Sequence, residues 1–148
     1  MSTTAAIQIR QATAADAARL AELATQLGYP SGPEEAMARL AVATPYAQHA
    51  VFVAENGDGR VVGWVDVQRF LVMAHDPVAE VTGLVVDAGC RRSGAGRALM
   101  RRAEEWAREH GLSRLLVRSN IIRHDAHAFY EGIGYSRLKT QVNFLKKL

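Results

Sequence analysis

The part of this sequence best suited to hold a ligand is a glycine-rich turn at residues 91–96, which read RRSGAG. The turn follows an apolar run and precedes a segment with helical periodicity. The first N–H groups of a helix have no internal partner and carry partial positive charge. Gly94 and Gly96 let the backbone approach an anion closely, and Arg97 adds charge beside them. The spacing is neither that of a dinucleotide fingerprint nor that of a Walker loop, so the turn alone is equally well a plain tight turn or a phosphate site.

The positive charge of the chain is concentrated near this turn. The formal net charge is +3, and five arginines lie between positions 91 and 102. A concentrated patch suits a small polyanion better than a nucleic-acid duplex, which needs an extended basic surface. We therefore expect no nucleic-acid partner. For Arg101 and Arg102, a solvated helix face is the simpler interpretation.

Metal chemistry and covalent catalysis find little support in the sequence. The single cysteine, Cys90, excludes an internal disulfide and a cysteine-rich metal site. The five histidines lack HExxH-type spacing, so we expect no metal ion. Cys90 lies beside the turn, but the sequence near it shows no Cys-His-Asn set of catalytic residues, so we do not expect a nucleophile there.

The size and composition are those of one globular domain. The chain has 148 residues, of which 49% are hydrophobic and 22% charged, with no repeat or linker. We therefore predict a single domain over residues 1–148. No apolar run approaches the ~18 residues of a membrane span, and the first residues lack the features of a signal peptide. These features predict a cytoplasmic location without membrane association.

Periodicity predicts the elements that position the turn. Strands are predicted where apolar residues alternate or form short runs: 7–10, 50–54, 61–73, 81–86, 114–118 and 135–148. Helices are predicted where apolar residues recur every three or four positions: from a capping box at Thr13 to Gly28, from Pro33 through Leu40, from the glycine-rich turn to Gly111, and over 124–131. This order predicts an α/β (α+β) fold with a mixed, mostly antiparallel central sheet flanked by helices.

Several motifs recur in a fixed order along most of the chain. They are the turn with its preceding strand at 84–87 (LVVD), an N-terminal strand with two helices, the pair Gly63-Trp64, and the run 126–135 (AHAFYEGIGY). Together they resemble the GNAT superfamily of N-acetyltransferases. The resemblance implies a GNAT-like acyl-CoA N-acyltransferase fold and acetyl-coenzyme A (acetyl-CoA) as co-substrate. It also implies that the turn wraps the pyrophosphate of the coenzyme.

The resemblance further implies coenzyme contacts in the strand before the turn. In the family, the backbone of this strand hydrogen-bonds the pantetheine arm and the thioester carbonyl, and Gly83 indicates a bulge or a close backbone approach there. Family members often carry an asparagine where Arg123 stands. Either Asn120 replaces it or Arg123 binds a coenzyme phosphate, and we favour Asn120. The predicted coenzyme-binding residues are Leu84, Val85, Val86, Arg91, Arg92, Ser93, Gly94, Ala95, Gly96, Arg97 and Asn120.

Glu80 is the candidate base that the resemblance implies, because some family members place a glutamate at this position. Strand parity would put Glu80 on the face of Thr82 and Leu84. A solvated carboxylate at a strand end is the alternative interpretation. Asp66 and His75 are weaker candidates for the base, and ordered water is a further one.

Tyr130 is the candidate acid, because many family members use the tyrosine of the Phe-Tyr pair to protonate the sulfur of coenzyme A. A phenol with a pKa of about 10 is suited to a developing thiolate. Core packing is the alternative, since Tyr130 shares a helical face with Ala126, Phe129 and Ile133.

The predicted function is acetyl transfer from acetyl-CoA directly to a primary amine of a small molecule, because the chain carries no appended recognition module. Acetylation of a protein N-terminus or lysine and a non-catalytic acyl-CoA sensor remain alternatives. A polyamine or aminoglycoside acceptor would favour an acidic groove, for which the available residues are Glu34, Glu35, Asp66 and Asp76. The apolar C-terminal strand could pair across an edge, so a homodimer is a further prediction.

Overall fold

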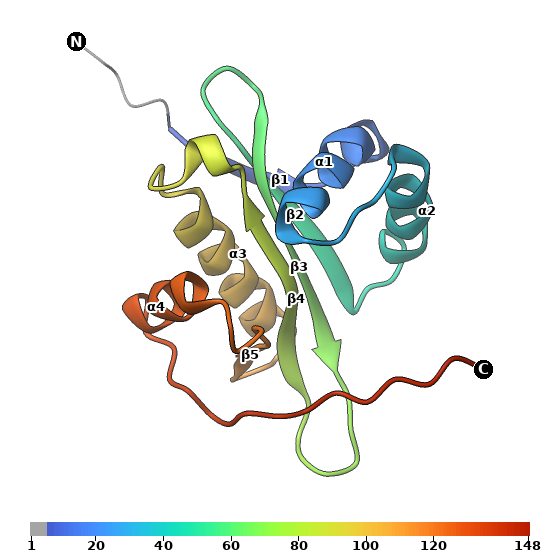
Figure 1. Cartoon of the computed structure of the whole chain (residues 1–148), viewed down its shortest axis with the longest axis vertical. Helices are drawn as coiled ribbons and strands as arrows, with labels where there is room; N and C mark the ends of the chain where they lie inside the picture. The colour runs from blue at the N-terminus through green and yellow to red at the C-terminus, as the bar shows by residue number, and fades with distance from the viewer. Residues whose placement is uncertain (1–5) are drawn as a thin grey trace. The chain divides into compact units, whose positions relative to one another are not determined.

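The computed structural model describes residues 6–148, which form two compact units, one ending at Val117 and one beginning at Arg118. Within these residues, the first unit carries the strands and the second carries one helix (Figure 1). The expectation of a single domain over residues 1–148 stays a prediction.

The first unit is built on a five-stranded sheet whose strands are adjacent in sequence order. The strands are β1 (Gln8–Gln11), β2 (His49–Glu55), β3 (Val61–Phe70), β4 (Val78–Val86) and β5 (Leu115–Val117). The first four pair antiparallel, and β5 pairs parallel with β4. The sheet is therefore mixed and mostly antiparallel, which confirms the predicted fold class.

Helices cover both faces of this sheet (Figure 1), namely α1 (Ala17–Leu27), α2 (Pro33–Ala43) and α3 (Ala95–Glu109). The neighbours Gly63 and Trp64 in β3 point to opposite faces. A side chain at Gly63 would lie 3.2 Å from Leu99 of α3, whereas the Trp64 ring nitrogen donates a hydrogen bond to the carbonyl of Leu20 in α1 at 3.2 Å. Thus α3 packs on one face, and α1 and α2 pack on the other.

The start and stop signals predicted for the helices of the first unit are found, although α1 begins only at Ala17 and α2 extends to Ala43. Thr13 and Asp16 form the expected capping box, and a short 3₁₀ turn, η1 (Ala14–Asp16), leads into α1. Gly28 ends α1 in the left-handed conformation, with φ 103°, and Pro33 is the first residue of α2. The predicted apolar stripe of α3 is buried: Leu99, Ala103, Trp106 and Ala107.

The second unit contains α4 (His124–Gly132), as predicted, followed by a chain without helix or strand up to Leu148. The predicted strand over 135–148 is therefore wrong. Alternation of apolar residues creates a face, but a strand also needs a neighbouring edge to accept its hydrogen bonds. Val142, Phe144 and Leu145 lie exposed in this tail, at 75–94% of their full accessibility.

Candidate active site

The glycine-rich turn is entered through β4 and a second 3₁₀ turn, η2 (Ala88–Cys90). Arg92 and Gly94 both adopt left-handed backbone conformations, with φ 69° and 86°. Gly94 is the N-cap of α3, and its carbonyl accepts the first helical hydrogen bond from the Ala98 amide at 3.0 Å. The amides of Gly96 and Arg97 precede that bond, so they face the open end of the helix.

This geometry fits a pyrophosphate. A side chain added at Gly94 would meet no atom within 4 Å, so the space beside the turn is open. Arg91, Arg92 and Arg97 are exposed around it. Amide donors at a helix start, open space and nearby cations are what a bound phosphate requires.

A β-bulge interrupts the pairing of β4 with β3. Val81 is opposite Val67 and Gly83 is opposite Asp66, so Thr82 is the extra residue in β4. A side chain at Gly83 would lie 2.7 Å from the Trp64 ring. The bulge predicted at Gly83 is therefore found beside it, and glycine is required there because the tryptophan ring occupies the space.

The bulge corrects the predicted orientation of Glu80. Glu80 is opposite Gln68, and Gly83 is opposite Asp66. Asp66 and Gln68 lie two residues apart on one face of β3, so Glu80 shares that face with Gly83. The expectation that Glu80 faces the same way as Leu84 is wrong, because the extra residue reverses the alternation. Glu80 is also not a solvated strand end, since it is the third residue of β4 and only 6% exposed.

The sheet face under α1 changes from apolar to polar along the strands. Val53, Trp64 and Val85 form an apolar cross-strand row, and the next row contains Val51, Asp66 and Gly83. The third row is entirely polar: His49, Gln68 and Glu80. We name the polar part of these rows the polar floor, defined as His49, Asp66, Gln68 and Glu80. Its position beside the bulge brings a buried glutamate and an aspartate onto one face.

His49 and Asp66 form an ion pair within the polar floor. They are diagonal neighbours on β2 and β3, and the His49 Nε2 atom hydrogen-bonds the Asp66 carboxylate. Both side chains are largely buried, with 21% and 29% of their surface exposed. The Asp66 carboxylate raises the pKa of His49, although burial opposes this effect.

In the second unit, α4 places Tyr130 on a half-buried face with Ala126, Phe129 and Ile133, as the sequence predicts. The Tyr130 ring lies edge-on to that of Phe129, with 5.3 Å between ring centroids. Burial raises the pKa of the Tyr130 hydroxyl above its usual value, and the charge of Arg123 partly opposes this effect. The phenol therefore stays protonated at neutral pH, as a proton donor must.

Asn120 lies before α4 and supports the local chain. Its side-chain oxygen accepts a hydrogen bond from the Ile122 amide at 3.2 Å, and its carbonyl accepts one from the His127 ring at 2.9 Å. Arg123 is the N-cap residue of α4. Coenzyme contacts of Asn120 or Arg123 stay predictions.

The remaining candidates lie outside the strands that form the polar floor. His75 and Asp76 occupy the exposed connection between β3 and β4, where the His75 ring hydrogen-bonds the Asp76 carbonyl at 2.7 Å. Glu34 and Glu35 lie exposed in the first turn of α2. No cluster of three or more potential metal ligands occurs among residues 6–148, and the expectation of no metal stays a prediction.

A cavity of about 280 Å³ also lies away from the turn. It shares His49 with the polar floor, and its other charged lining residues include Arg102 and Glu109. Arg102 hydrogen-bonds Glu109 at 3.2 Å and stacks over the Phe52 ring. The charged lining of this cavity thus includes the paired side chains of Arg102 and Glu109 and no residue of the turn.

Residues 17–135 match the model of the acetyltransferase (GNAT) family. The chain belongs to this family. An aminoglycoside N(6')-acetyltransferase type 1 from Stenotrophomonas maltophilia is 33% identical over 144 residues, covering 92% of this chain and 90% of the relative. A second such protein, from Serratia marcescens, is 26% identical over 125 residues, covering 81% and 86%.

Solved GNAT structures share the fold. AAC(6')-Iy, in complex with the bisubstrate analog CoA-S-monomethyl-acetylneamine, aligns with a TM-score of 0.84 at 18% identity, over 97% of this chain and 99% of that chain. The resemblance and the prediction of an acetyl-CoA-dependent N-acetyltransferase are thus confirmed. No helix in the described part of this GNAT enzyme has the length and apolar character to cross a membrane.

The sequence did not indicate two features of this GNAT enzyme. The pairing of His49 with Asp66 depends on strand register, which the residue pattern alone does not specify. Asp87 hydrogen-bonds the Gly89 amide at 3.2 Å and so caps η2. An aspartate directly after a strand and before a turn is the signal that could have identified this cap.

Proposed function

We propose that this GNAT enzyme acetylates an amino group of a small polycationic amine, an amino sugar of the aminoglycoside type. The polar floor carries this proposal. Asp66 and Glu80 place two carboxylates on one sheet face beside the bulge, with His49 paired to Asp66, and carboxylates are the groups that recognise a cationic acceptor. The printed names of the two relatives support the same acceptor class.

The turn at 91–96 is proposed to hold the pyrophosphate of acetyl-CoA. Its Gly96 and Arg97 amides and the exposed guanidinium groups of Arg91 and Arg92 would bind the phosphate oxygens. The backbone of β4 from Leu84 to Val86 would hydrogen-bond the pantetheine arm, and Asn120 would add a contact. These roles follow from the family resemblance and from the open geometry of the turn.

The proposed reaction is a direct transfer. Glu80, itself or through water, accepts the proton that the amine loses as its nitrogen attacks the thioester carbonyl carbon. The bond from this carbon to sulfur then breaks, and Tyr130 donates its proton to the sulfur. Acid–base assistance of this kind is worth about 10²–10⁴-fold in rate. The raised pKa of Tyr130 keeps the phenol protonated, so it has a proton to donate.

The proposal includes a homodimer formed through the C-terminal tail. Val142 and Phe144 are exposed and lie two residues apart, so an extended tail presents both on one face. Pairing with a strand edge of a second copy would supply the missing hydrogen bonds. Sedimentation should show a dimer, and deletion of residues 138–148 should yield a monomer; a wild-type monomer would contradict this part.

A cytoplasmic location without nucleic-acid or membrane partners also remains part of the proposal.

The acceptor class is tested by release of free coenzyme A thiol from acetyl-CoA. The panel should include aminoglycosides, linear polyamines, neutral amino sugars and lysine-containing peptides. We expect turnover with aminoglycosides and a KM about tenfold higher for them in Asp66→Asn, because a charge-assisted contact is lost. Turnover confined to peptides would favour the protein-acetylating alternative. Coenzyme binding without turnover on any amine would favour the sensor.

A further inference from the structure

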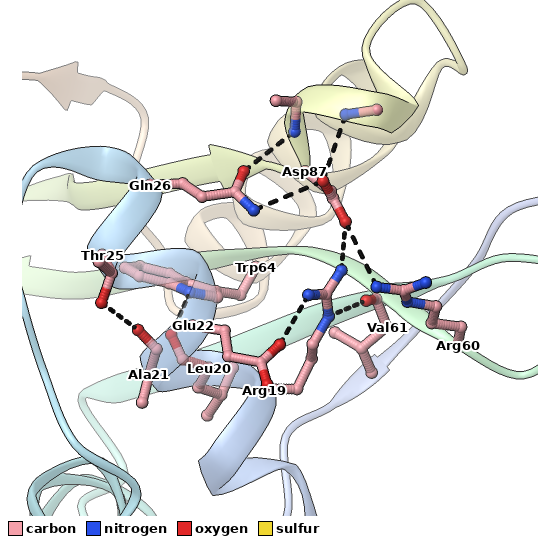
Figure 2. A network of polar contacts seen from close by, with 12 residues as sticks. Arg19, Leu20, Ala21, Glu22, Thr25, Gln26, Arg60, Val61, Trp64 and Asp87 are labelled. Carbon is pink, nitrogen blue, oxygen red and sulfur yellow. Dashed lines mark hydrogen bonds and ion pairs between the residues drawn. The ribbon is translucent and has the colours of Figure 1, made fainter.

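A polar network joins α1 to the chain that enters the glycine-rich turn (Figure 2). Arg19 of α1 is its centre, and its side chain is only 17% exposed. The Arg19 Nε atom donates to the Val61 carbonyl at 2.8 Å, and Nη2 donates to the Asp87 carboxylate. Asp87 follows β4 directly, so one helical side chain holds both the start of β3 and the end of β4.

Gln26, two turns further along α1, holds the same segment (Figure 2). Its side-chain oxygen accepts a hydrogen bond from the Ala88 amide at 3.0 Å, and its nitrogen donates to Asp87 Oδ1 at 3.5 Å. The Asp87 amide also donates to the Val62 carbonyl at 2.8 Å. The first two residues after β4 are therefore fixed by side chains of α1 and by the backbone of β3.

The turn needs support at this end. Its exit is anchored by the buried residues Ala95 and Leu99 of α3, whereas Ala88 and Gly89 on the entry side are exposed. Arg92 within the turn has φ 69°, a left-handed conformation that residues with a side chain disfavour. Polar contacts at Asp87 thus hold the entry of the turn in place, and apolar packing of α3 holds its exit.

Two nearby arginine side chains neutralise the charge of the Asp87 carboxylate. An isolated carboxylate four residues before Arg91 would repel an anionic ligand at the turn. Arg19 pairs with this carboxylate, and the Arg60 Nη2 atom lies 3.8 Å from it. The carboxylate therefore supplies hydrogen-bond acceptors to Gly89 and Gln26 without placing net negative charge beside the turn.

We infer that Asp87 is a positioning residue for the coenzyme, holding the glycine-rich turn in its binding conformation through Arg19 and Gln26. The inference rests on the proposed role of the turn in binding acetyl-CoA. It assigns to α1 the task of fixing the coenzyme site, in addition to covering the sheet.

The test combines coenzyme A titration calorimetry with hydrogen exchange of residues 88–97 in the free protein. Asp87→Ala should weaken coenzyme A binding about tenfold and speed exchange in this segment. Asp87→Asn should recover part of both losses, because asparagine also caps a helical turn. Arg19→Met combined with Asp87→Ala should weaken binding little more than Asp87→Ala alone, since Arg19 reaches the turn through its pair with Asp87, which Asp87→Ala already removes.

Two controls separate positioning from general stability. Glu22 is a second, exposed partner of Arg19 and lies on α1 itself, not on the chain that enters the turn. Glu22→Gln should therefore change neither coenzyme A binding nor hydrogen exchange of residues 88–97. Val53→Ala loses core packing and lowers the melting temperature, but should leave the coenzyme Kd unchanged. Kinetically, Asp87→Ala should raise the KM for acetyl-CoA far more than it changes kcat or the acceptor KM.

A folded Asp87→Ala protein with wild-type Kd and wild-type exchange in residues 88–97 would overturn the inference. If the wild-type protein itself fails to bind coenzyme A, the proposed function fails. The exchange measurement then still decides whether Asp87 positions the turn.

Discussion

The glycine-rich turn and the polar floor lie in the same unit, but they are built in opposite ways. The turn offers main-chain amides at the start of α3, and its shape comes from backbone conformations at Arg92 and Gly94. The polar floor offers side chains from three strands, and its shape comes from strand register and the bulge at Thr82. The first region offers donors that suit a phosphate group of any carrier, whereas we propose that the second discriminates among amines.

This difference predicts that the two regions respond to different substrates. Changes in the turn should alter coenzyme binding and leave the acceptor KM unchanged. Changes in the polar floor should do the reverse. A third class of change, at Tyr130, should alter the chemical step and neither binding constant.

The largest effect is expected for Gly94→Asp, which should weaken coenzyme A binding more than about 1,000-fold. Aspartate places a like charge beside the phosphates and strains a residue with φ 86°. Calorimetry measures the loss. Gly111→Asp is the matched control, because Gly111 also has a positive φ and open space but ends α3 away from the turn. Equal loss of binding in both variants would mean that strain alone, and not the anion site, explains the effect.

Tyr130→Phe should lower kcat about 100-fold with little change in the KM of either substrate. Because burial raises the pKa of Tyr130, deprotonation of its phenol should reduce the wild-type rate only above pH 10. At lower pH, deprotonation of Tyr130 should not affect the wild-type rate. Steady-state kinetics across pH checks both points. Tyr135→Phe removes a neighbouring phenol and serves as the control. Full activity of Tyr130→Phe would exclude Tyr130 as the acid.

Arg92→Gly should have two smaller effects: it should stabilise the fold and weaken coenzyme A binding. Relief of the left-handed conformation should raise the free energy of unfolding by about 1 kcal/mol. Loss of the guanidinium should weaken coenzyme A binding a few-fold, roughly one charge-assisted contact. Denaturant unfolding and calorimetry measure the two. A variant that gains stability and keeps its affinity would show that Arg92 does not contact the coenzyme.

The smallest effect concerns the ion pair of the polar floor. Asp66 raises the pKa of His49 above its unfolded value of 6.5, so the pair stabilises the fold below that pH, and this stabilisation is lost as pH rises through the folded pKa. His49→Gln should therefore lower the free energy of unfolding by up to about 1 kcal/mol near pH 5.5 and by less above pH 8. Denaturant unfolding at the two pH values tests this. A loss that grows with pH would contradict the assigned direction.

The sequence predicted the turn well and the polar floor poorly, for a physical reason. Glycines, caps and the helical period act locally, so the start of α3 at residue 95 and the end of α1 at Gly28 could be read from neighbouring residues. The orientation of Glu80 depends on one extra residue in β4, which reverses every later position along that strand. The prediction of a strand over residues 135–148 was wrong because the residues of that segment do not specify a pairing partner for it.

We propose that Asp66 in the polar floor binds a cationic acceptor while the turn binds acetyl-CoA. Initial rates with both substrates varied, for wild type and Asp66→Asn, test it most directly. We predict that Asp66→Asn raises the KM for an aminoglycoside about tenfold and leaves the KM for acetyl-CoA unchanged. An unchanged aminoglycoside KM, or an equal rise in both constants, would contradict the assignment of the two regions to two substrates.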